Sequence, residues 1–188
     1  MKDAIYEMKK LNLASSSHQT AVATVADKEA NNNLLKNPAF NTFNGWMETV
    51  CNYDIVIVQR DPLRKDGSED GKKVLCLWSI GSWRMNSGVY QLTNILPVGE
   101  YTLSANVRIE KEYDGMDNCG VFLRISDVSG NLLAESEHVA KSSTEYTPLS
   151  VTASLSEDRA VVVGIYTNGA GKTYVDDMCF KRMGDVLR

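Results

Sequence analysis

The sequence has few of the residues that most catalytic sites need. Its 188 residues include only two histidines, His18 and His138. Nucleophilic hydrolysis requires a nucleophile, a base and an orienting group that act together, and His is the commonest base. Asp176 and Asp177 are adjacent, and successive side chains of a strand point to opposite faces, so they would not converge as glycosidase carboxylates do. These shortages predict a protein that is not an enzyme.

Three further absences exclude other classes of protein. The 20 Lys and Arg residues form no basic stripe and are outnumbered by 24 Asp and Glu residues, which argues against nucleic-acid binding. The longest apolar run, around residues 55–58, is far shorter than the ~20 residues of a membrane-spanning helix. The first thirty residues lack the apolar stretch of a complete signal peptide, so we expect an export signal to have been removed or to lie upstream. The four cysteines lack CxxC spacing and define no disulfide scaffold.

A change in composition near Asn32 predicts two parts of the chain. Residues 3–14 place apolar side chains three apart among Lys and Glu, which is typical of a short amphipathic helix. The Ser- and Asn-rich residues that follow, up to 33, bury little and indicate a linker. We therefore expect a helix and linker over residues 1–32 and a folded domain over residues 33–188.

After Asn33, short β-branched and aromatic runs alternate with Gly, Pro, Asn and Asp, a pattern that predicts an all-β sandwich of two antiparallel sheets. Residues 99–110 show the clearest alternation, with Tyr101, Leu103 and Ala105 beginning the face expected to line the core. Residues 120–127 separate Val121, Leu123 and Ile125 from an opposite face in the same way. The expected strands span residues 34–36, 55–60, 74–80, 88–92, 99–110, 120–127, 132–137, 146–155, 160–166 and 173–182.

Residues 169–173, GAGKT, superficially match the end of a phosphate-binding loop. The first glycine of that motif would fall at position 166, which is Tyr166, and a strand rather than a helix follows. We therefore expect a hairpin turn at residues 169–173.

Aromatic and amide side chains gather between residues 77 and 91. Sugar rings stack their C–H faces on aromatic planes, and their hydroxyl groups bond to amide, carboxylate or guanidinium groups. Trp46 is expected to be structural, because Trp in a sandwich usually packs in the core. Trp83 lies in a polar, glycine-flanked stretch where an indole is harder to bury. The candidate sugar-binding residues are Trp78, Trp83, Arg84, Asn86, Tyr90, Arg108 and Arg124.

Three motifs in order carry a family resemblance. They are NLLKNPAF at residues 33–40 with NGW at 44–46, then VYQ at 89–91 with LPVGEYTLSANVR at 96–108, and finally YVDDM at 174–178. Together they resemble the opening, the central hairpin and the closing strand of galactose-binding-like jelly-roll carbohydrate-binding modules from polysaccharide-degrading bacteria. The resemblance implies non-catalytic carbohydrate binding and a secreted, periplasmic or cell-surface location, and also a catalytic domain as neighbour.

The same resemblance implies a structural calcium ion held by an acidic residue after the opening motif and by an Asp of the closing strand. Here the corresponding positions are Asn41 and Asp176, and the loss of one carboxylate weakens a site for a hard cation. A second function stays open, because the same jelly roll can serve as a protein-interaction or spacer domain of a larger secreted protein. In that case the exposed aromatic residues would contact a neighbouring protein.

Overall fold

The computed structural model of the protein describes residues 33–40, 42–49, 55–60, 73–80, 86–114 and 119–184. The helix and linker expected within residues 1–32 lie outside these ranges. Across the described ranges the regular structure consists of β-strands. None of the residues described there forms a helix long and apolar enough to cross a membrane.

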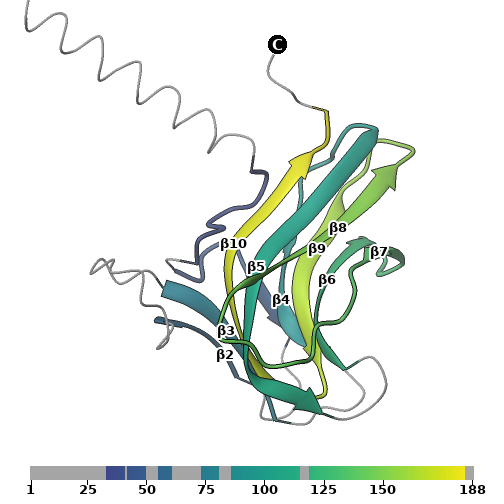
Figure 1. Ribbon diagram of the computed structural model, residues 1–188. Coiled ribbons are helices and arrows are strands. Elements are labelled where there is room, and N and C mark those ends of the chain that lie inside the picture. Colours follow the sequence, from purple (N-terminus) through teal and green to yellow (C-terminus); the bar gives the residue numbers. More distant parts are fainter. Residues whose placement is uncertain are drawn as a thin grey trace, which may run out of the picture. The chain divides into compact units, whose positions relative to one another are not determined.

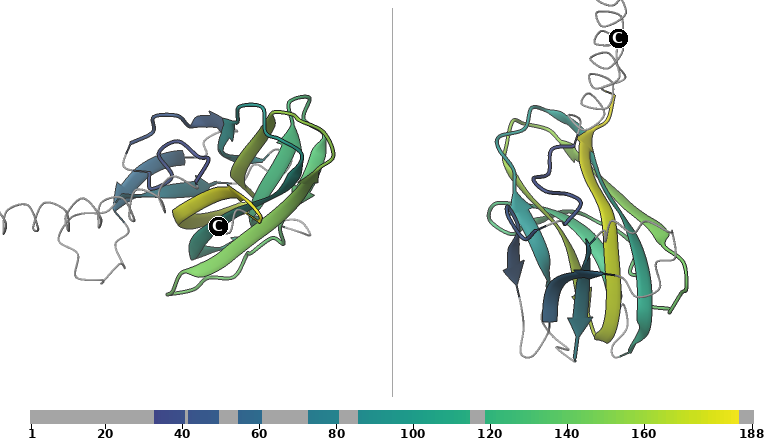
Figure 2. Two further views of the ribbon diagram at one scale, coloured as in Figure 1. Left: turned by 90° about the horizontal axis from the view of Figure 1, so that it is seen from above. Right: turned by 90° about the vertical axis from the view of Figure 1, so that its left-hand side faces the viewer.

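The described residues form ten strands in two antiparallel sheets. The two sheets pack face to face (Figures 1 and 2). The first sheet has the order β1-β4-β9-β6-β7 and the second the order β2-β3-β10-β5-β8. This arrangement confirms the all-β, two-sheet antiparallel jelly-roll prediction. The strands are β1 (Met47–Thr49), β2 (Ile55–Arg60), β3 (Lys73–Ser79), β4 (Ser87–Leu92), β5 (Gly99–Asp114), β6 (Gly120–Asp127), β7 (Leu132–Glu135), β8 (Thr147–Leu155), β9 (Val161–Asn168) and β10 (Ala170–Arg182).

The core lies between the two sheets and follows the predicted alternation. In β5 the side chains of Tyr101, Leu103, Ala105, Val107 and Ile109 are all at most 3% exposed, as expected for one face of a strand. Apolar side chains of β6 and β9 meet them from the first sheet. Burial of these faces fixes the register, because a slip of one residue would turn each apolar set towards solvent.

Trp46 packs in this core beside the opening motif. Its indole is 7% exposed and stacks on Phe40 with ring centroids 4.9 Å apart. The indole Nε1–H donates a hydrogen bond to the carbonyl oxygen of Asn37 at 3.0 Å. The structural interpretation of Trp46 is therefore confirmed.

The strand expected at residues 34–36 does not form. The chain bends there, and positive φ angles at Asn37 and Phe40, 49° and 50°, turn it away from an extended path. It is held by Leu34 N–H, which donates to the carbonyl oxygen of Phe180, and by two bonds that Lys36 exchanges with the amide of Gln91. The three-residue strand β1 was not predicted, because Met-Glu-Thr is too short to show alternation.

Two connections that were predicted to be hairpins join different sheets instead. Only Gly169 separates β9 from β10, and its φ of 79° turns the chain from the first sheet to the second. The segment between β4 and β5, the expected central hairpin, makes the same kind of crossing. The predictions of a hairpin turn at residues 169–173 and of a central hairpin between residues 91 and 99 are therefore wrong.

Candidate functional site

The outer side of the first sheet carries a group of aromatic and polar side chains, here called the aromatic face. In β6, Val121, Leu123 and Ile125 enter the core, so Phe122 and Arg124 point outward. The register pairs Phe122 with Tyr166 of β9, and Gly164 with both Arg124 and Tyr90. The aromatic face comprises Asn86, Tyr90, Phe122, Arg124, Glu135, His138 and Tyr166.

Three rings of this face pack against one another. The imidazole of His138 lies parallel to the Phe122 ring, with centroids 4.1 Å apart and an interplanar angle of 4°. The Tyr166 ring lies on the other strand, 6.0 Å from Phe122 by centroids and inclined by 26°. Phe122 is completely buried and Tyr166 is 9% exposed, although neither belongs to the main core. The rings therefore form a fixed platform on the outside of the sheet.

Gly164 makes room for the Tyr166 ring. A Cβ atom at this position would lie 2.9 Å from both Cε2 and Oη of Tyr166, and 2.5 Å from the carbonyl oxygen of Val89. These separations are too short for a real side chain, so the ring lies across the glycine against the sheet. The absence of a side chain at Gly164 thus allows the Tyr166 ring to lie directly on the backbone of the sheet.

Arg124 and Glu135 occupy the centre of the aromatic face. The Arg124 guanidinium lies 5.1 Å from the Phe122 centroid and 5.6 Å from that of Tyr166, close enough for cation–π attraction. Its Nε donates to Oε2 of Glu135 at 2.7 Å, while Oε1 of Glu135 lies 3.1 Å from Nε2 of His138. The amide oxygen of Asn86, in the orientation that satisfies both groups, accepts from Nη1 of Arg124 at 3.1 Å.

The surroundings of two groups shift their pKa values. Burial opposes ionisation of Glu135, but hydrogen bonds from His138 and Arg124 outweigh it and lower the pKa of Glu135 below its usual value. Burial raises the pKa of the Tyr166 phenol to about 12. At neutral pH the face therefore presents an ionised carboxylate, a guanidinium and a neutral phenol.

The predicted site residues fall on two different sheets. Asn86, Tyr90 and Arg124 share the aromatic face, whereas Trp78 of β3 and Arg108 of β5 lie on the outer side of the second sheet. The described candidates therefore do not share one surface, because β3 and β5 belong to the other sheet. Trp83 and Arg84 lie outside the described residues and stay predictions.

Comparison with solved structures identifies relatives of the fold. TmCBM61, solved with β-1,4-galactotriose, aligns with a TM-score of 0.55 over 80% of this chain and 98% of its own, at 20% identity. The chain has the fold of a carbohydrate-binding module. No protein-family model and no curated protein matches the sequence. The likeness therefore concerns the three-dimensional arrangement of this jelly roll.

Similar jelly rolls also occur inside larger enzymes. The arabinose-bound MgGH51 α-L-arabinofuranosidase aligns with a TM-score of 0.58 at 15% identity, over 79% of this chain but only 26% of the enzyme. The structure of the CBM22-1 and GH10 modules of Clostridium thermocellum xylanase 10B with xylohexaose aligns with a TM-score of 0.50 at 17% identity. The alignment covers 83% of this chain and 29% of the xylanase chain. The chain thus spans about a quarter of these two proteins.

The structure describes one of the two residues predicted to hold calcium, Asp176. No group of three His, Cys, Asp or Glu side chains suited to a metal occurs within the described ranges. Asp176 is buried at 3% exposure and its Oδ1 accepts the N–H of Asp177, whose own carboxylate bonds to Asn106. Asn41 lies outside the described residues. Because calcium takes six to eight oxygen ligands and Asp176 is one of them at most, the calcium site stays a prediction.

Four members of the aromatic face were not predicted as site residues: Phe122, Glu135, His138 and Tyr166. The outward position of Phe122 and Arg124 was visible in the alternation of residues 120–127. What the sequence did not show is that Tyr166 and His138 lie beside them, because that depends on the pairing of β9 with β6 and on the segment after β7, which continues along β6 to a bridge between Val121 and Val139. The geometry provides stacking planes and hydrogen-bonding groups, and Glu135 is the one carboxylate among them.

Proposed function

We propose that the chain is a non-catalytic module that binds a carbohydrate, either a polysaccharide or a glycan, through the aromatic face. The observation that carries this proposal is the grouping of Tyr90 and Tyr166 with Arg124, whose guanidinium lies over the buried Phe122 ring. Aromatic planes accept the C–H faces of a sugar, while Arg124, Asn86 and Glu135 offer donors and acceptors for its hydroxyl groups. The fold shared with TmCBM61 adds support.

The arrangement of Glu135 favours binding over hydrolysis. Glycoside hydrolysis requires two carboxyl groups on either side of the scissile bond. Glu135 has no carboxylate partner on the aromatic face, and both of its oxygens are engaged by Arg124 and His138. Such a residue orients Arg124 and is unsuited to act as a nucleophile.

We further propose that the module acts outside the cytoplasm beside a catalytic domain. Polysaccharides are met in the secreted, periplasmic or cell-surface compartments, and a module that holds one serves an enzyme that cleaves it. The xylanase 10B structure joins a CBM22-1 module to a GH10 module. Fractionation of producing cells tests the location, and a cytoplasmic protein would contradict it.

A glycan array followed by calorimetric titration of the best glycan tests the binding proposal. We expect Arg124→Ala to raise Kd about ten- to hundredfold, because it removes charged hydrogen bonds worth about 1.5–3 kcal/mol. Arg159→Ala is the matched control: Arg159 is also paired with a glutamate, at 3.0 Å, and its side chain is 33% exposed, but it lies beyond the aromatic face. That variant should bind like the wild type.

Two results would contradict the proposal. Equal effects of the two arginine variants would mean that the aromatic face does not hold the glycan. Absence of binding across the array, together with capture of a protein partner that Arg124→Ala abolishes, would favour the protein-interaction function instead.

A further inference from the structure

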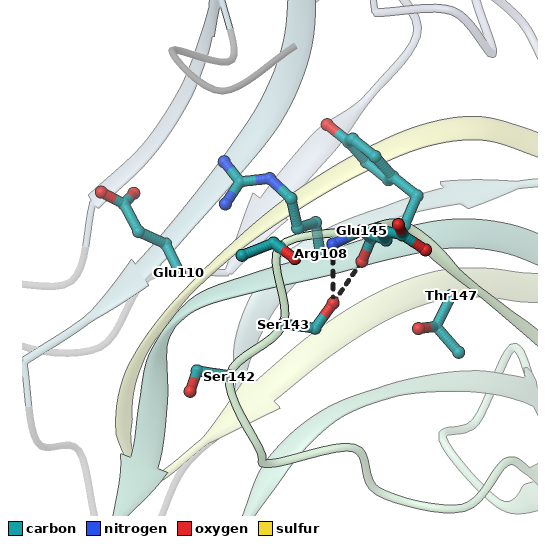
Figure 3. A pocket seen from close by; sticks show the side chains of 8 residues that line it. Arg108, Glu110, Ser142, Ser143, Glu145 and Thr147 are labelled. Atoms are coloured by element: carbon teal, nitrogen blue, oxygen red, sulfur yellow. Dashed lines mark hydrogen bonds between the residues drawn. The ribbon is translucent and has the colours of Figure 1, made fainter. Parts of the chain in front are cut away.

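A second polar site lies on the opposite side of the sandwich. A pocket of about 660 Å³ opens between β5 and residues 142–147, lined by Arg108 and Glu110 from the strand and by Ser, Thr, Glu and Tyr side chains from the segment (Figure 3). It belongs to the outer face of the second sheet, so it is separated from the aromatic face by the whole core.

Both walls of this pocket are fixed in place. The Arg108 guanidinium lies 4.5 Å from the Tyr174 ring centroid, and the residue is 1% exposed. On the other wall, Ser143 N–H donates to the carbonyl oxygen of Ile109 at 2.9 Å, and the Ser143 hydroxyl bonds to both backbone groups of Glu145. Burial of an arginine costs free energy, and here it places a rigid guanidinium at a polar pocket.

An exposed tryptophan, Trp78, lies beyond the pocket on the outer side of the same sheet. Glu110 forms an ion pair with Lys172 at 2.9 Å, and Lys172 lies 5.3 Å from the ring centroids of both Trp78 and Tyr174. The Trp78 indole is 40% exposed. Two strand spacings and two residues along the strand separate Trp78 from Arg108, about 12 Å in all. A short oligosaccharide can therefore extend from Trp78 to the pocket.

The charges around the pocket balance. The hydrogen bond between Lys172 and Glu110 raises the pKa of Lys172. Burial of Glu110 acts to raise the pKa of its carboxyl group, but the bond with Lys172 and the other favourable interactions of the carboxylate together outweigh burial and lower that pKa. Both groups are therefore ionised. Arg108 and Lys172 are then offset by Glu110 and Glu145. A site without net charge does not attract an anion over a neutral ligand. Hydroxyl groups, carboxylates and an exposed indole are instead groups that bind a neutral sugar.

We infer that the pocket between β5 and residues 142–147, together with Trp78, is a second binding site for a neutral saccharide. The inference stands independently of the aromatic face. With both faces in use, one module would hold two chains or two stretches of a polysaccharide, which increases avidity without new contacts.

The test uses the chain with its aromatic face disabled by Arg124→Ala and Tyr90→Ala, both partly exposed positions. Xylohexaose, β-1,4-galactotriose and trigalacturonate are titrated by calorimetry and by NMR of the Trp indole N–H signals. We expect a neutral probe to bind and to shift the Trp78 signal. Adding Trp78→Ala should raise Kd about tenfold, as loss of one stacking plane does. Glu110→Gln should raise it severalfold.

Thr102→Ala, at the other end of the same face of β5, is the control and should leave Kd unchanged. The inference is overturned if the disabled chain binds neither neutral probe, if only trigalacturonate binds, or if Trp78→Ala and Glu110→Gln have no effect. Failure of the aromatic face gives a different pattern: in the otherwise unaltered chain, Trp78→Ala would then raise Kd about tenfold and Arg124→Ala would leave it unchanged.

Discussion

Replacing Gly164 with alanine should damage both the stability and the proposed binding surface. The new methyl group would lie 2.5 Å from the carbonyl oxygen of Val89 and 2.9 Å from the Tyr166 ring. The backbone oxygen belongs to β4, which pairs with β9, so it cannot retreat without disturbing the sheet. Overpacking of this kind costs about 1–3 kcal/mol, which lowers Tm by roughly 2–12 °C in a domain of this size.

The same substitution should weaken sugar binding, because the Tyr166 ring must lift off the sheet. Loss of one stacking plane costs about 1–3 kcal/mol of binding free energy. Gly130→Ala is the comparison: nothing lies within 4 Å of its Cβ position, but its φ of 88° makes alanine strained. It should lower Tm without changing affinity. Thermal melting and calorimetry measure both quantities. A Gly164→Ala protein that binds as tightly as wild type and melts no lower than Gly130→Ala would refute the reasoning.

Three further predictions concern acid, calcium and catalysis. Since the pKa of Glu135 is lowered in the folded state, its contribution to stability is present above the unfolded value of about 4.5 and is lost as the pH falls through the folded value. Between pH 5 and pH 3 the Glu135→Gln protein should therefore lose less free energy of unfolding than the wild type. Glu137→Gln is the control: Glu137 is exposed, and this variant should lose as much as the wild type. Chelation of calcium should leave Tm nearly unchanged, because Asp176 is the one buried carboxylate in the part of the chain that the structure describes; a large fall would reveal a site completed by residues such as Asn41. Reducing-sugar assays with xylohexaose and galactotriose should detect no turnover, and turnover abolished by Glu135→Gln would overturn the non-catalytic proposal.

The sequence predicted the strands better than their partners. Alternation in β5 and β6 identified the core faces, because burial of one face imposes a period of two on the side chains. Which strands pair with each other is harder to predict from the sequence. Short segments such as the one around Gly169 are typical of hairpins, and nothing local shows that β9 and β10 belong to different sheets. Strand β1, which was not predicted, has too few residues to show an alternation of apolar and polar side chains.

The division of the candidate site into two faces has the same cause. Trp78 and Tyr90 are close in the sequence, and both point outward, but β3 and β4 lie in different sheets. Conversely, Phe122, His138 and Tyr166 are widely separated in the sequence and come together only through the register of β6 with β9 and through the segment after β7 that continues along β6. Residue type was thus a fair guide to chemistry, and position in the sequence was a poor guide to proximity.

The most direct test of carbohydrate binding by the aromatic face is an NMR titration of the protein with the strongest glycan from the array. We expect the largest saturable shifts at Tyr90, Arg124 and Tyr166 and in the backbone of β4, β6 and β9 beneath them. Shifts confined to other surfaces, with these signals unmoved at saturation, would contradict it.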